Sequence, residues 1–134
     1  MLEPYSILQL QTSSPEVIEQ LDHASSLGRE LRDENRKQKL AQNLVERYVA
    51  KAGGGIYWQS EDTKGANPLD LAVQSAKKYP NFFSPWLERV RQLQVDKLEN
   101  ILARVPVEWM SVESKQFCIK MMSVTVETLK AVQL

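Results

Sequence analysis

Residues 111–134, SVESKQFCIKMMSVTVETLKAVQL, decide the fold because they carry a long helical pattern. Ser111 is a candidate N-cap, since its hydroxyl can accept a hydrogen bond from a free backbone N–H of the first helical turn. Residues three and four positions apart share one face of a helix. Here that face carries Phe117, Cys118, Met121, Met122, Thr125 and Leu129. We expect a terminal helix whose methionine-rich face packs into the core or, where exposed, serves as an adaptable partner surface.

A second helix is expected over residues 33–52, DENRKQKLAQNLVERYVAKA, where apolar residues recur at three- and four-residue spacing. Its first turns are polar, so we expect them to project into water while the second half docks on the core. Gly53, Gly54 and Gly55 predict the end of this helix, because glycine has low helix propensity and adopts positive φ freely. A phosphate-binding loop would need a preceding strand and a Gly-Lys-Ser/Thr ending, which this stretch lacks.

Shorter helices are expected where a capping residue stands before an apolar repeat. Ser14-Pro15 predicts a helix that runs to about Leu27, with Gly28 after it in the left-handed conformation. Three more helices are predicted between residues 52 and 111. Their starts are at Asn67-Pro68, Ser84-Pro85 and Asp96, and Pro80 and Pro106 are stops.

The fold class that follows is all-α: an orthogonal bundle of about five to six helices in one domain, residues 1–134. Residues 5–11, YSILQLQ, are β-prone, and residues 55–59, GIYWQ, read as a short strand or an extended segment. We therefore allow a minor β element at these two places, with residues 1–20 as an arm. A length of 134 residues, with 43% apolar and 25% charged side chains, suits a single domain of this kind.

The charge balance argues against nucleic acid and against an acidic membrane as partners. Lys plus Arg and Asp plus Glu are 17 each, so the formal net charge is zero. A local basic cluster is interrupted by acidic residues, which predicts a solvated helix face rather than a nucleic-acid surface. This cluster consists of Arg29, Arg32, Arg36, Lys37 and Lys39.

Cysteine content and hydropathy indicate a cytoplasmic protein. The single cysteine, Cys118, has no internal disulfide partner and is expected to be a buried small apolar residue. No apolar run approaches the ~20 residues of a membrane span. Glu3 stands where a signal peptide would carry positive charge. We therefore expect no membrane partner.

The chain has one histidine, His23, directly after Asp22. A single histidine excludes a multi-histidine zinc site and the H-E-x-x-H motif. Neighbouring residues on a helix point in different directions, so Asp22 and His23 cannot easily form a catalytic pair. No nucleophile turn of the G-x-S-x-G type accompanies them. We therefore interpret His23 as structural and predict no catalytic residue.

Three stretches together resemble the C-terminal lobe of HipA-like serine/threonine kinases. They are LDHASSLGREL at 21–31, RYVAKAGGGIYW at 47–58 and ILARVPVEWMSVESKQF at 101–117, and the resemblance covers residues 21–134. In that family the aspartate of a similar Asp-His-x-Ser-Ser-Leu-Gly segment coordinates the Mg²⁺ bound to ATP. The resemblance therefore implies that Asp22 is a metal ligand.

The rest of a kinase site is missing from this chain. A kinase needs an ATP-positioning lysine and a catalytic-loop aspartate and asparagine before its second metal-binding aspartate. Residues 1–21 contain no lysine, aspartate or asparagine. One carboxylate binds Mg²⁺ poorly without phosphate and further oxygen ligands. We therefore expect a C-terminal helical portion, or a remnant, that is inactive by itself, with no cofactor of its own. Mg²⁺ and ATP would bind only if a partner chain completed the site.

The partner implied by this resemblance is a kinase N-lobe or an antitoxin-like protein. Self-association is the other partner that we consider. The alternative hypothesis is a small helical protein–protein interaction module. Its contacts would come from the methionine-rich terminal helix or from Trp58, Trp86 and Trp109, because tryptophan is enriched at interfaces.

Overall fold

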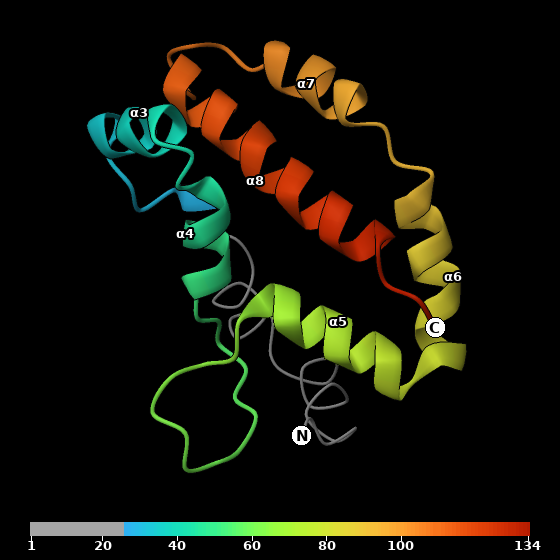
Figure 1. Ribbon diagram of the computed structural model, residues 1–134. Coiled ribbons are helices and arrows are strands. Elements are labelled where there is room, and N and C mark those ends of the chain that lie inside the picture. Colours follow the sequence, from blue (N-terminus) through green and yellow to red (C-terminus); the bar gives the residue numbers. More distant parts are fainter. Residues whose placement is uncertain (1–25) are drawn as a thin grey trace.

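The computed structural model describes residues 26–134, and all regular structure within that range is helical (Figure 1). The elements are the 3₁₀ helix η1 (Ser26–Gly28) and the α-helices α3 (Asp33–Ala41), α4 (Val45–Lys51), α5 (Pro68–Lys78), α6 (Pro80–Arg91), α7 (Val95–Ala103) and α8 (Val112–Lys130). The all-α prediction is thereby confirmed. No strand forms at residues 55–59. The predictions for residues 1–20, including the β element at 5–11, for most of the helix from Pro15, and for Asp22 and His23 lie outside the described range.

Helix α8 is the centre of the structure (Figure 1). It contacts η1, α3, α4, α6 and α7, while α5 packs against α6. Two buried clusters lie at different positions along it. One joins Val45 and Val49 of α4 to Phe117, and the other joins Ala76 and Leu87 to Val132, just after the end of α8. The terminal helix predicted from residues 111–134 therefore organises the other helices.

The caps predicted for α8 and α5 are confirmed. The Ser111 hydroxyl oxygen accepts a hydrogen bond from the Ser114 N–H at 3.1 Å. Asn67 Oδ1 accepts hydrogen bonds from the N–H groups of Leu69 and Asp70, both at 3.0 Å. The other end of the same amide, Nδ2, donates to carbonyl oxygens at the end of α4, among them Val49 at 2.7 Å. The side chain of Asn67 thus provides hydrogen-bond partners both for free backbone N–H groups at the start of α5 and for free carbonyl oxygens at the end of α4.

The single helix predicted over residues 33–52 is wrong, because the chain breaks between α3 and α4. Asn43 has φ 55°, in the left-handed region that asparagine tolerates better than most residues. The break lets α4 leave the direction of the polar α3, and Val45 and Val49 of α4 are then buried with Phe117. The predicted stop is confirmed, since α4 ends at Lys51 and Ala52 is its extended C-cap.

Two predicted helix starts are displaced. Pro80 ends α5 as expected, but it also begins α6, so Ser84-Pro85 lies inside that helix. Pro80 fits the first helical position because proline needs no N–H partner there. Asp96 is in the first turn of α7, whose N-cap is Gln94 without a side-chain hydrogen bond. The aspartate lies in the first turn, where a negative charge interacts favourably with the helix dipole, but two positions after the N-cap.

The loop between α4 and α5 is closed by backbone hydrogen bonds. The Gly54 N–H donates to the Ala66 carbonyl at 2.8 Å, and the Ala66 N–H donates to the Ile56 carbonyl at 2.6 Å. A Cβ on Gly65 would lie 1.7 Å from the Gly54 carbonyl oxygen, so the two backbones approach too closely for a side chain. The strand allowed at residues 55–59 is therefore wrong, because these residues belong to a loop closed by backbone hydrogen bonds.

Gly28 holds the turn between η1 and α3 against α8. Its φ is +74°, as the left-handed position predicted for it requires. A Cβ at this position would stand 2.5 Å from Cε1 of Phe117, whose side chain is 0% exposed. Glycine is therefore needed here both for its backbone conformation and for its lack of a side chain.

Replacing Gly28 with alanine is expected to lower the free energy of unfolding by about 2–5 kcal/mol. The left-handed backbone costs about 1–2 kcal/mol for a residue with a Cβ. Overpacking against Phe117 adds a similar amount, roughly 1–3 kcal/mol. Urea unfolding followed by far-ultraviolet circular dichroism measures the change.

The matched control is Gly53→Ala. Its nearest side-chain neighbour is the flexible Lys64, at 3.1 Å from the added Cβ, and its φ is not positive. We expect a change within about 1 kcal/mol. Equal losses of stability in the two variants would contradict the role assigned to Gly28.

Candidate interaction surfaces

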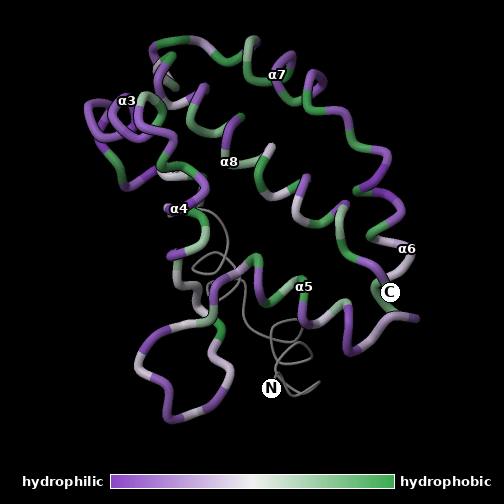
Figure 2. The backbone as a smooth tube through the Cα atoms, in the orientation of Figure 1, coloured by the Kyte–Doolittle hydropathy of each residue, from purple (hydrophilic) through white to green (hydrophobic). Residues whose placement is uncertain are grey.

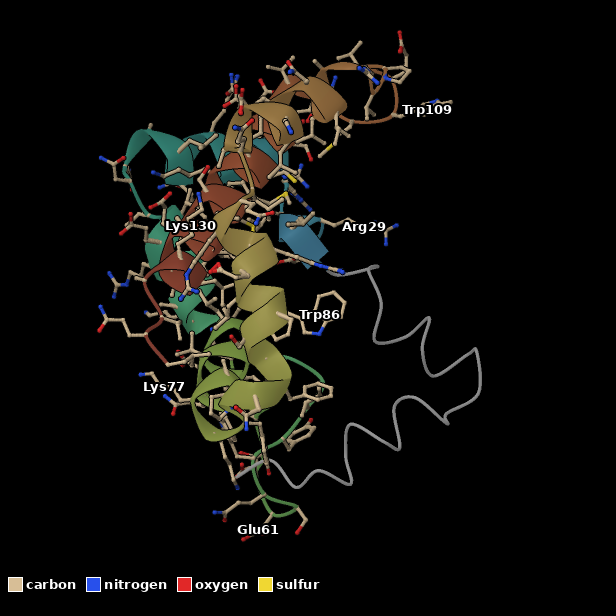
Figure 3. All side chains as sticks on the ribbon, turned by 90° about the vertical axis from the view of Figure 1, so that its right-hand side faces the viewer. Arg29, Glu61, Lys77, Trp86, Trp109 and Lys130 are labelled. Carbon is tan, nitrogen blue, oxygen red and sulfur yellow. The ribbon has the colours of Figure 1, made fainter. Side chains whose placement is uncertain are left out.

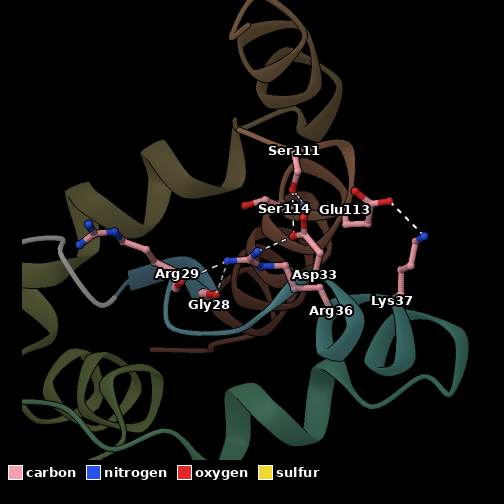
Figure 4. Close-up of polar contacts among 8 residues, drawn as sticks. All are labelled: Gly28, Arg29, Asp33, Arg36, Lys37, Ser111, Glu113 and Ser114. Atoms are coloured by element: carbon pink, nitrogen blue, oxygen red, sulfur yellow. Dashed lines mark hydrogen bonds and ion pairs between the residues drawn. The ribbon is translucent and has the colours of Figure 1, made fainter. Parts of the chain in front are cut away.

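A buried arginine joins three parts of the chain (Figure 4). Arg36 is 9% exposed, although it lies on the polar helix α3. Its Nη1 donates to Asp33 Oδ1 at 2.6 Å, and its Nη2 donates to the carbonyl oxygens of Gly28 and Arg29 at 3.0 and 3.2 Å. Asp33 Oδ1 also accepts a hydrogen bond from the Ser111 hydroxyl at 2.9 Å. The Arg36 network therefore ties the η1 turn and α3 to the start of α8.

This network lowers the pKa of the Asp33 carboxyl. The largest cause is the hydrogen bond from Arg36, followed by the hydrogen bond from Ser111. Both stabilise the ionised form, as hydrogen bonds to a carboxylate do. Nε of Arg36 is buried and has no hydrogen-bond partner among residues 26–134. Through these hydrogen bonds the guanidinium holds the η1 turn against α3, which is a structural role.

The basic cluster predicted from sequence does not form one solvated surface. Arg36 is buried, and Lys37 Nζ lies 3.4 Å from Glu113 of α8. Lys39 Nζ lies 5.7 Å from the ring centroid of Tyr48. The expectation of a solvated face is therefore wrong for Arg36. The Asp33–Arg36 spacing of three residues indicates an ion pair along α3, but the carbonyl oxygens of Gly28 and Arg29 that also bind the guanidinium carry no sequence signal.

Cys118 is buried, as predicted, and burial raises the pKa of its thiol. A raised pKa makes the thiolate scarce, so this cysteine is unreactive by the usual criterion. Met121 packs against the Phe117 cluster, and Sδ of Met122 lies 4.0 Å from Sγ of Cys118. The methionine-rich face was expected either to pack into the core or to form an exposed partner surface. In the structure Met121 and Met122 pack within the chain.

Two of the three tryptophans are exposed. Trp109 is 83% exposed and Trp86 is 56% exposed, whereas Trp58 is half-buried. Figure 3 shows Trp86 and Trp109 on the same side of the molecule. A large apolar side chain exposed to this degree is unfavourable in water, so these two residues are the candidate contacts for a partner.

Three more exposed apolar side chains lie close to Trp109 in the sequence. We define the Trp109 surface as four residues of α7, the start of α8 and the segment between them: Ile101, Val107, Trp109 and Val112. Each is more than half exposed. Figure 2 shows hydrophobic residues along α7 and its connection to α8. None of the residues of α7 is buried, although its sequence is amphipathic.

Trp86 has a different environment on α6. The guanidinium carbon of Arg89 lies 4.9 Å from its ring centroid, which is within the range of a cation–π contact. Phe82, one turn earlier, is also exposed and packs edge-on against Phe83, with 5.2 Å between ring centroids. Part of the Trp86 ring is therefore already covered by the chain itself.

No metal site is found within residues 26–134, where no three His, Cys, Asp or Glu side chains are grouped closely enough. Asp22, the metal ligand implied by the kinase resemblance, lies outside this range. No helix in the same range is long and apolar enough to cross a bilayer. Comparisons with protein families, with curated proteins and with solved structures found no match. The kinase resemblance therefore stays a prediction.

The lowered pKa of Asp33 predicts a pH dependence of stability. The folded state holds this carboxyl ionised to lower pH than the unfolded state, where its pKa is about 4. Between those two pKa values the unfolded chain binds more protons, so stability decreases as the pH falls through that window. Asp33→Asn should lose this contribution. We expect the difference in unfolding free energy between wild type and Asp33→Asn to be largest at neutral pH and to shrink below about pH 4.

Urea unfolding at a series of pH values between neutral and strongly acidic measures this difference. Glu99→Gln on α7 is the control, because Glu99 is exposed and has no hydrogen bond or ion pair to another described residue. Its unfolding free energy should follow that of wild type across the series. If the difference in unfolding free energy between wild type and Asp33→Asn stayed constant with pH, the role assigned to the ionised Asp33 carboxylate would be contradicted.

Proposed function

We propose that this protein is a small helical interaction module that self-associates through the Trp109 surface. The observation that carries the proposal is the 83% exposure of Trp109, together with three further apolar side chains between residues 101 and 112 that are more than half exposed. Interfaces between proteins are enriched in tryptophan, and a few such side chains supply most of the binding free energy. Full burial of a large apolar side chain is worth roughly 1.5–3 kcal/mol. The four side chains of the Trp109 surface together can therefore offset part of the entropy cost of association.

The charges of the chain favour a second copy of the same chain as the partner. The formal net charge of the chain is zero, so two copies do not repel each other at long range. Arg104 and Glu108 are both exposed beside the Trp109 surface, and they carry opposite charges. In a two-fold interface the same surface meets itself, so each charge can face its opposite on the other copy. Figure 1 shows α7 at the edge of the helical array, where a second molecule has access.

The kinase resemblance is a separate hypothesis about the origin of the sequence. In that hypothesis the chain is the C-terminal helical portion of a HipA-like kinase, and Asp22 contributes to an Mg²⁺ site only when another chain supplies the ATP-binding residues. It rests on three sequence stretches. Self-association through Trp109 does not depend on it.

Sedimentation equilibrium over a range of protein concentrations tests the proposal. The wild-type chain should form dimers, and Trp109→Ser should raise the dissociation constant of the dimer roughly 30-fold or more, as loss of a hot-spot side chain does. Trp86→Ser is the matched control, because it removes an exposed tryptophan on the same side of the molecule but outside the Trp109 surface.

We expect Trp86→Ser to change the dissociation constant by less than about threefold. Far-ultraviolet circular dichroism checks that both variants remain folded. A wild-type chain that stays monomeric up to about 1 mM would contradict the proposal, since that limit corresponds to only about 4 kcal/mol of binding free energy. An equal effect of the two tryptophan substitutions would contradict the placement of the interface.

A further inference from the structure

A groove of about 480 Å³ lies where α4, the start of α5 and α8 come together. Figure 1 shows these three helices, and each comes from a different part of the sequence. Apolar side chains from all three line the groove: Val49 of α4, Leu69 of α5 and Val124 of α8. Its volume is in the range of sites that bind small ligands or the side chains of a peptide. It is separate from the Trp109 surface, with which it shares no residue.

The charged side chains of the groove are mostly acidic. Glu46, Asp70 and Glu127 each contribute a carboxylate from a different helix, whereas Lys120 is the one basic residue among the lining residues that the structure describes. None of these four side chains has an ion pair or a side-chain hydrogen bond with another residue in the described part of the chain. The carboxylates are therefore available to cations from outside, and the groove attracts positive charge.

The spacing along α8 gives the groove a direction. Lys120, Val124 and Glu127 are separated by four and three residues, so they lie along one face of that helix and extend over two turns. The sequence of lining side chains along α8 is thus basic, apolar and acidic. A ligand that lies along α8 would contact the three apolar side chains in the middle of the groove. It would meet carboxylates on α4, on α5 and near the C-terminal part of α8.

The chain's own N-terminal segment is a poor occupant for this groove. Residues 1–25 contain Glu3, Glu16, Glu19 and Asp22, and they contain no lysine or arginine. An acidic segment would bring more negative charge to three carboxylates, which is unfavourable. Nucleic acid is disfavoured for the same reason. The charge pattern therefore favours a basic occupant, which residues 1–25 do not supply.

We infer that this groove binds a basic amphipathic segment of a partner protein. The apolar side chains of the segment lie against Val49, Leu69 and Val124, and its lysine or arginine side chains pair with the three carboxylates. This is the common mode in which an amphipathic peptide places its apolar face in a groove and uses charge for specificity. The inference goes beyond the proposed self-association, because it concerns a different surface and a different partner.

Fluorescence anisotropy of a labelled peptide tests the inference on the full chain. The probe is a short amphipathic peptide made only of leucine and lysine. The variant Glu46→Gln/Asp70→Asn/Glu127→Gln removes the three carboxylates of the groove. The control Glu61→Gln/Glu88→Gln/Glu99→Gln removes the same number of charges at exposed positions that do not line the groove. Both variants have the same net charge, so non-specific attraction of the peptide changes equally in the two.

We expect the groove variant to weaken binding roughly tenfold or more, since three partly exposed ion pairs are lost together. The control should weaken it by less than about threefold. A lysine–serine peptide of equal charge should bind at least roughly tenfold more weakly than the leucine–lysine peptide, because it leaves the apolar floor uncovered. That comparison distinguishes an amphipathic segment from a simple polycation.

Ala50→Phe provides a second variant that leaves every charge in place. Ala50 is exposed and lines the groove, so a phenyl ring there occupies its space without removing a buried side chain. Binding should again fall roughly tenfold or more. Circular dichroism verifies the helical content of each variant.

Three results would overturn the inference: no binding of the leucine–lysine peptide at about 100 μM, equal weakening by the groove variant and its control, or loss of binding in Trp109→Ser with full binding in the groove variant. Because Trp109 does not line the groove, peptide binding by Trp109→Ser shows whether the groove works without self-association. A monomeric chain that binds the peptide in the groove would contradict the proposed function while supporting the inference.

Discussion

The contact between Phe117 and Gly28 is the constraint on which the rest of the described structure depends. Phe117 is completely buried in α8, and the space beside its ring exists because Gly28 has no side chain. The ring of Tyr48 meets it edge-on at 5.4 Å between centroids, and Val45 and Val49 complete the cluster. The same Gly28 exposes its carbonyl to Arg36. One residue thus connects the apolar core to the Arg36 network, so the η1 turn, α3, α4 and α8 are positioned together.

The capping residues in the sequence correctly predict where several helices begin. They do not predict the helix boundaries that depend on tertiary packing. Asn67 and Ser111 cap their helices as expected, because a cap depends on a side chain and the next few N–H groups. Asn43 breaks a predicted helix because burial of Val45 and Val49 requires a new direction, which the apolar repeat does not reveal. Ser84-Pro85 has the composition of a helix start, but Pro80 had already begun that helix five residues earlier.

The candidate surfaces were harder to predict than the helices. The sequence suggested that tryptophans are available to a partner, yet it could not separate the half-buried Trp58 from the exposed Trp86 and Trp109, since exposure depends on distant packing. Arg36 was expected in water and is buried by groups at positions 28, 29 and 33. The groove was not predicted, because its carboxylates come from three helices and converge only in the folded chain.

Helix α7 links the stability of this fold to its proposed assembly. It is amphipathic, yet none of its residues is buried, so it gains less from packing than any helix that places side chains in a core cluster. Such elements open at lower free energy than the rest of a fold. A second copy that covers Ile101 of α7 together with Trp109 would bury apolar surface of this helix. Because binding to the folded state stabilises it in proportion to the logarithm of partner concentration, association would stabilise α7 more than the Phe117 cluster, which is complete within one chain.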